Sequence, residues 1–161
     1  MLIETLFTVE VAKSALVAYI HYLGIIFCFG SLLFERLTLK VDLNRNETIS
    51  MIIADVVYGL AGVAILVTGI LRVKYFGQGG DFYTANPVFW IKVSFYVLVG
   101  LLSLYPTTTY ILWAIPLSKN KFPEISDNLV KRFRFIITTE LVGFATIPLF
   151  ATLMARGVGL G

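Results

Sequence analysis

The chain contains a single histidine, His21, at the start of the apolar stretch HYLGIIFCFGSLLFERL, residues 21–37. A histidine inside such a stretch suits three kinds of chemistry. It can be a buried side chain held by a neighbouring helix, an axial ligand to the iron of a heme or related tetrapyrrole, or a proton carrier. The sequence leaves all three roles open, and in the second of them His21 is the metal ligand.

A tetrapyrrole site needs cations for its carboxylates as well as an imidazole nitrogen. Candidate cations flank the apolar runs, and a thioether that could act as a sixth ligand lies near the last of them. These candidate cofactor-binding residues are Arg72, Lys92, Arg156 and Met154. Lysines near helix ends often extend to the membrane interface, and that alternative stays open for Lys92.

Lys92 and Glu140 are the candidate catalytic residues. Glu140 lies about two turns inside the last apolar run, where it could carry protons. The simpler alternative is that it pairs with Arg36 or Lys131. The motifs of common soluble enzymes, such as a Walker loop, G-x-G-x-x-G, H-E-x-x-H or C-x-x-C, do not occur in the sequence.

The composition indicates a membrane protein. Of the 161 residues, 58% are hydrophobic and 14% are charged, whereas soluble domains are about 45–50% apolar and about 25% charged. The basic residues cluster in loops beside apolar runs, which predicts contact with the bilayer and not with nucleic acid. The single cysteine, Cys28, excludes a disulfide within the chain.

Four apolar runs are long enough to cross a bilayer as helices. We therefore predict an all-α fold, a bundle of four transmembrane helices forming a single domain over residues 1–161. The predicted N-terminal caps of the second, third and fourth helices are Ser50, Asn86 followed by Pro87, and Asp127. The predicted helices cover about 14–34, 51–71, 88–113 and 133–155.

Each predicted helix carries its few polar residues on one face, so the four faces are expected to form a polar core. On the second helix this face contains Asp55 and three glycines, Gly59, Gly62 and Gly69, which predicts a seam of close helix packing. Gly24 lies one turn from His21 and is expected to leave room beside it. Gly59 and Gly62 are expected to widen the same space.

The Lys and Arg distribution predicts the orientation. Eight basic residues lie in or beside the first and third loops, and five lie on the opposite side. Because basic residues are enriched in the cytoplasm, loops one and three are expected there, with both termini outside.

The segment His21–Leu37 resembles the first-helix motif of HemJ-type membrane protoporphyrinogen oxidases. The match rests on His21, Gly24, Gly30 and the pair Arg36–Leu37, with a spacing one residue shorter. The segment 89–92, Phe-Trp-Ile-Lys, is similar to the tryptophan-then-lysine element of that family. The resemblance implies that His21 and Lys92 are tied to heme b and activity. A further histidine of that family is missing, and the matching region here reads Leu-Tyr-Pro at 104–106.

Nearly the whole chain resembles a family of small bacterial and cyanobacterial predicted membrane proteins. The resemblance is carried by the stretch from His21, by DVVYGLAGVAILVTGILRVKYFGQGGDFY, by NPVFWIKV with LLSLYPT, and by LMARG. It implies a location in the bacterial inner membrane or the thylakoid membrane, and it does not imply a particular activity.

Three functional hypotheses follow. The leading one is a protein that binds heme or a related tetrapyrrole, with a redox role and, if it is an enzyme, a HemJ-like oxidoreductase activity. The second is an accessory or assembly subunit of a respiratory or photosynthetic membrane complex. The third is a small transporter that uses the polar core as its path. A homodimer stays open, because it could supply a second His21.

Overall fold

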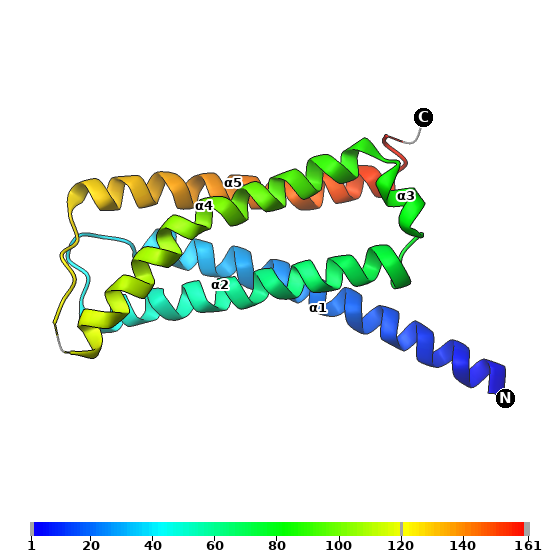
Figure 1. Cartoon of the computed structure of the whole chain (residues 1–161), viewed down its shortest axis with the longest axis horizontal. Coiled ribbons are helices and arrows are strands. Elements are labelled where there is room, and N and C mark those ends of the chain that lie inside the picture. The colour runs from blue at the N-terminus through cyan, green and yellow to red at the C-terminus, as the bar shows by residue number, and fades with distance from the viewer. Residues whose placement is uncertain (1, 120, 160–161) are drawn as a thin grey trace.

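Four long helices make up most of the structure, a computed structural model that describes residues 2–119 and 121–159 (Figure 1). No β-strand occurs among these residues. Between the second and third long helices lie a π-helical turn, η1 (Arg72–Phe76), and a short helix, α3 (Gly80–Thr84). This architecture confirms the all-α prediction. The long helices are α1 (Leu2–Thr38), α2 (Arg45–Leu71), α4 (Pro87–Ser118) and α5 (Asp127–Ala155).

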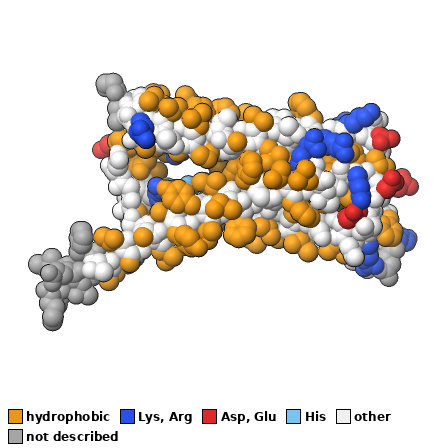
Figure 2. All heavy atoms as spheres, turned by 180° about the vertical axis from the view of Figure 1, so that it is seen from behind, with side chains coloured by type: hydrophobic (Ala, Val, Ile, Leu, Met, Phe, Trp, Pro, Cys, Tyr) orange, Lys and Arg blue, Asp and Glu red, His pale blue; other side chains and the backbone are white. Residues whose placement is uncertain are grey.

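Each of the four predicted runs lies inside a longer apolar helix. The helical stretches suited to crossing a membrane are 8–38, 45–76, 87–118 and 127–155. At most 28% of the residues in the most apolar window of any stretch are buried in the protein. The remaining apolar surface would be costly in water, so it must face lipid. Figure 2 shows hydrophobic side chains along the middle of the bundle and charged ones at its two ends, most of them at one end.

The bundle has a loop end and a terminal end. The loop end carries residues 39–44, 119 and 121–126, and the terminal end carries both termini with η1 and α3 (Figure 1). Helix α1 packs against α2 and α5, and α4 packs against α5 and α2. Among the described residues, the backbones of α1 and α4 do not come close together, and the backbones of α2 and α5 do not either. These two pairs are therefore the diagonals of a four-helix bundle.

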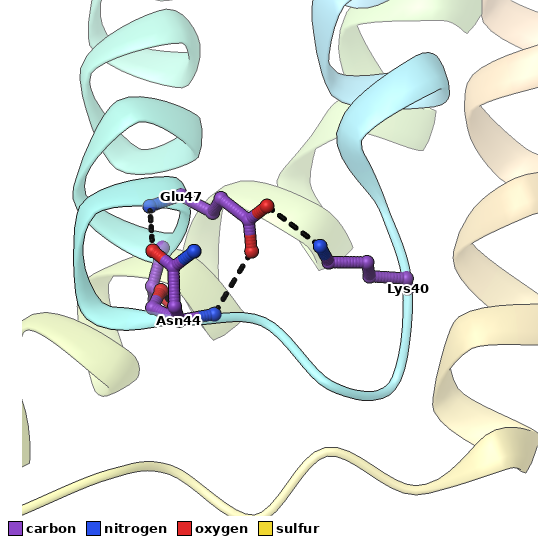
Figure 3. Close-up of polar contacts among 4 residues, drawn as sticks. Lys40, Asn44 and Glu47 are labelled. Atoms are coloured by element: carbon purple, nitrogen blue, oxygen red, sulfur yellow. Dashed lines mark hydrogen bonds and ion pairs between the residues drawn. The ribbon is translucent and has the colours of Figure 1, made fainter.

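Two of the three predicted caps are wrong. Helix α2 begins six residues before the predicted start at Met51, because Asn44 and Glu47 form a capping box there (Figure 3). Asn44 Oδ1 accepts from the Glu47 amide at 3.0 Å, and Glu47 Oε2 accepts from the Asn44 amide at 2.9 Å. The Lys40 ammonium, 2.6 Å from Glu47 Oε1, links this box to the loop. Ser126, and not Asp127, caps α5, and the predicted Asn86 cap of α4 is confirmed.

The predicted glycine seam on α2 is only partly confirmed. An added Cβ on Gly69 would lie 3.5 Å from His21 Cε1, and one on Gly62 would lie 3.9 Å from the Tyr96 hydroxyl. The buried face of α2 repeats every three or four residues and includes Asp55 and Thr68. Gly59 has no neighbouring side chain within 4 Å of the position of a Cβ atom. A closer approach occurs at Gly24 of α1, where an added Cβ would lie 2.7 Å from Ile65 Cγ1. The residues of the buried face are Thr48, Met51, Asp55, Tyr58, Ala61, Ile65 and Thr68.

Candidate functional site

His21 is half-buried on α1 and is held by Thr68 of α2. Its Nδ1 atom lies 2.9 Å from Thr68 Oγ1. The Thr68 hydroxyl donates its single hydrogen to the carbonyl of Ala64, at 2.5 Å. His21 must therefore donate from Nδ1–H, because Thr68 Oγ1 has only lone pairs left to offer. In this neutral tautomer Nε2 carries a lone pair, which suits it to bind a metal ion or accept a proton.

Two of the predicted cations lie near this imidazole. Arg72 in η1 and Lys92 on α4 are both within electrostatic range of His21. The Arg72 guanidinium carbon lies 5.4 Å from the centre of the Tyr22 ring, and Lys92 Nζ lies 5.1 Å from the centre of the Phe89 ring. We call His21, Thr68, Arg72 and Lys92 the histidine site. It is assembled from α1, α2, η1 and α4, at the terminal end of the bundle.

The other two predicted cofactor-binding residues, Met154 and Arg156, lie at the C-terminal end of α5. Met154 is buried near the C-terminal end of α5, and Arg156 is the exposed residue that ends that helix. Among the described residues, no hydrogen bond or ion pair joins Arg156 to the histidine site. The expected sixth ligand and third cation therefore stay predictions from the sequence.

The glycines expected to open space near His21 behave differently from one another. Gly24 opens none, because Ile65 fills its surroundings. Gly59 and Gly62 line a cavity of about 220 Å³ between α2 and α4, which Cys28 and Phe144 close from the other two helices. Tyr96 also lines it and donates from its hydroxyl to the Gly62 carbonyl at 2.7 Å. Tyr96 follows Lys92 by one turn of α4, so the cavity begins about 6 Å from the level of the histidine site.

A second group of polar side chains converges nearer the loop end. Glu35, Asp55 and Glu140 are buried, with 2%, 7% and 1% of their surface exposed. Tyr110 is fully buried, and its hydroxyl faces the Glu35 carboxyl. The geometry between the two groups does not meet the criteria for a hydrogen bond. The four residues come from α1, α2, α5 and α4 respectively, and we call them the carboxyl cluster. Of the predicted catalytic pair, Lys92 thus belongs to one site and Glu140 to the other.

A family described as "Predicted membrane protein (DUF2214)" matches residues 13–159 of the chain. The chain belongs to this family. The match extends over all four membrane-spanning helices, so membership agrees with the fold and with a multi-pass membrane location. The chain matches no curated protein and no solved structure. The family description names no cofactor or reaction, so both must be argued from the geometry of the two sites.

Sequence reasoning missed two residues that the structure places in these sites. Thr68 lies outside the predicted glycine face, and a threonine in an apolar helix usually bonds only to its own backbone. Tyr110 lies in an apolar aromatic run, and the sequence alone gives no sign that its hydroxyl faces Glu35. The structure also places Arg36 differently from the suggested pairing with Glu140. Its Nε atom donates to Thr138 Oγ1 at 2.9 Å.

Proposed function

We propose that this protein binds a heme or related tetrapyrrole at the histidine site of its membrane bundle. The observation that carries the proposal is the hydrogen bond between His21 and Thr68. It fixes the imidazole as the Nδ1–H tautomer and leaves Nε2 as a potential ligand atom. Histidines that bind metals in proteins commonly donate their other ring nitrogen in this way.

The surrounding charges suit the carboxylates of such a molecule. Arg72 and Lys92 approach the imidazole from two different helical segments, and no acidic side chain is paired with either in the described residues. Cations held near membrane depth without counter-ions favour an anionic ligand. When bound, a heme would supply one-electron redox chemistry, while the protein would supply the ligand atom, the cations and an apolar surrounding.

The space next to this site is apolar but small. The cavity between α2 and α4 measures about 220 Å³, whereas pockets for cofactor-sized molecules commonly reach about 300–1,000 Å³. Its walls include glycine and valine. Helix α2 packs mainly against α1, and α4 packs mainly against α5, so the contact between α2 and α4 is the weaker one for both helices. The proposal therefore requires these two helices to move apart when the tetrapyrrole binds.

The test is an absorption spectrum of protein purified in mild detergent from heme-replete cells, oxidised and then reduced with dithionite. We expect a Soret band and sharp reduced bands, lost in His21→Ala and altered in Lys92→Gln. Lys74→Gln, an exposed lysine in η1, serves as the matched control and should keep the wild-type spectrum. A folded, monodisperse protein that stays colourless and does not bind added heme would refute the proposal.

A further inference from the structure

The carboxyl cluster lies where the two diagonals of the bundle cross. Glu35 of α1 meets Tyr110 of α4 along one diagonal, and Asp55 of α2 interacts with Glu140 of α5 along the other. The backbones of these helix pairs do not come close in the described part of the chain, so only side chains at the bundle axis can meet. The four groups are therefore a shared site and not four separate surface residues.

Several polar atoms of this cluster have no hydrogen-bond partner among the described residues. They are Glu35 Oε1, Glu140 Oε1 and the Tyr110 hydroxyl oxygen. Asp55 is the exception, because Thr107 Oγ1 donates to its Oδ1 atom at 2.7 Å. Buried polar atoms without partners are costly and rare. Glu35 and Tyr110 face each other, and Glu140 Oε1 is left buried without a protein partner in the described part of the chain, so the hydrogen atoms that these oxygens need are not supplied by neighbouring donors.

Nearby basic side chains do not neutralise the cluster. Three arginines lie toward the same end of the bundle, but each donates elsewhere. Arg36 donates to Thr138, Arg132 to the Tyr105 hydroxyl and Arg134 to the carbonyl of Leu39. Two ion pairs in the described part of the chain join Glu10 with Lys13 and Glu47 with Lys40, and both lie outside the cluster.

A metal ion does not account for the missing charge. Within the described residues, no three acidic, histidine or cysteine side chains are close enough together to hold one. Three carboxylates within electrostatic range of one another in a buried site, beside arginines that donate elsewhere, cannot all stay ionised. The remaining way to neutralise them is to bind protons.

We propose that Glu35, Asp55, Glu140 and Tyr110 form a proton-binding site that stores protons within the membrane and passes them between helices. In each transfer an O–H bond breaks on one carboxylic acid and another forms on a neighbouring carboxylate, so the total charge of the cluster is unchanged. The Tyr110 hydroxyl is placed to donate to whichever Glu35 oxygen lacks a proton. The site does not depend on tetrapyrrole binding.

A route leads from this site toward the histidine site. Glu140 is within electrostatic range of the Tyr58 hydroxyl, and Ser103 lies beside that hydroxyl. Both Tyr58 and Ser103 line the cavity between α2 and α4, together with Tyr96 one turn from Lys92. The hydroxyl groups of Tyr58, Ser103 and Tyr96 therefore lie between the cluster and the level of Lys92.

Infrared difference spectroscopy of the full chain in lipid nanodiscs tests the proposal. Protonated carboxylic acids give a carbonyl band distinct from that of carboxylates. We expect this band at about pH 7, where exposed carboxyl groups are ionised, and a loss of intensity in Glu140→Gln, Asp55→Asn and Glu35→Gln. The control is Glu10→Gln, which removes an exposed carboxylate on α1. Absence of the band in the wild-type protein would overturn the proposal.

Carbodiimide labelling covers the case in which a variant does not fold, because it uses the wild-type chain. Dicyclohexylcarbodiimide partitions into lipid and adds a neutral carboxylic acid across one C=N bond, giving an acylurea without a leaving group. We expect mass spectrometry to find the adduct on Glu35, Asp55 or Glu140, with less of it as the pH rises. Labelling confined to exposed carboxylates, or protection of the cluster by Na⁺ or Mg²⁺ at constant pH, would contradict proton binding.

Discussion

His21 Nδ1 and Thr68 Oγ1 lie 2.9 Å apart and join α1 to α2 at the terminal end of the bundle. The bond combines two functions in one contact. It satisfies a half-buried imidazole, which is the structural role considered for His21, and it directs Nε2 away from Thr68, which is what a ligand role requires. The structural and functional interpretations of this histidine are therefore compatible.

Replacing Thr68 with valine should remove this bond while keeping the shape of the side chain. We expect a loss of about 1 kcal/mol in the free energy of unfolding, since a single hydrogen bond between membrane helices contributes about that much. ¹⁵N NMR of His21 should also show that the protonated ring nitrogen is no longer held at Nδ1. Thr152→Val is the control, because Thr152 is exposed and bonds only within α5. Equal effects from both variants would contradict the assigned role.

Gly24→Ala should destabilise the contact between α1 and α2. Its Cβ would lie 2.7 Å from Ile65 Cγ1 and 3.2 Å from the Ala61 carbonyl oxygen. We expect a loss of roughly 1–3 kcal/mol in stability, as for other overpacked sites. Adding Ile65→Ala should give a double variant less destabilised than the sum of the two single variants. Gly30→Ala meets no neighbour within 4 Å and should be neutral or stabilising.

Thr107→Val should weaken the carboxyl cluster by removing the donor to Asp55. The expected loss is roughly 1–2 kcal/mol in the free energy of unfolding, because Asp55 Oδ1 would be left buried without a partner. Thermal unfolding in detergent measures this loss. The neighbouring Thr108→Val removes an exposed hydroxyl that bonds only to the Tyr105 carbonyl, and it should change stability little. A similar loss in both variants would show that Asp55 does not depend on Thr107.

Asn86 should hold two segments together at the terminal end. Its Oδ1 atom accepts from the Val88 amide at 2.8 Å, and its Nδ2 atom donates to the Val158 carbonyl at 3.0 Å. Asn86→Ala should lose about 1 kcal/mol through the missing cap. Asn86→Asp keeps the cap acceptor and loses the donor, so it should speed hydrogen exchange near Val158 only. Unchanged exchange in the aspartate variant would show that the tail is held by other contacts.

The orientation predicted from Lys and Arg can be tested with cysteine labelling. Gln78 and Glu124 are exposed at opposite ends of the bundle, and the native Cys28 is fully buried, so it should add little background. In intact spheroplasts, an impermeant maleimide should label Gln78→Cys but not Glu124→Cys. Labelling of Glu124→Cys should appear after permeabilisation. The opposite pattern would place loops one and three outside.

The sequence by itself determined the class of the fold. Long apolar runs separated by charged loops leave helices as the structure that satisfies the backbone in lipid, and those runs lie within the four observed helices. It also singled out His21, Lys92 and Glu140, because ionisable groups at membrane depth stand out against their neighbours.

Only the tertiary structure decided which of these residues meet. Lipid is as apolar as the protein interior, so hydrophobicity does not separate the buried face of a membrane helix from its lipid-facing side. The predicted glycine seam on α2 was only partly right for this reason, and the hydrogen bond of Thr68 was missed. The packing of α1 against α2 brought Thr68 to His21, and the crossing of the two diagonals brought Glu35, Asp55, Glu140 and Tyr110 together. These contacts join residues far apart in the chain, which no local pattern specifies.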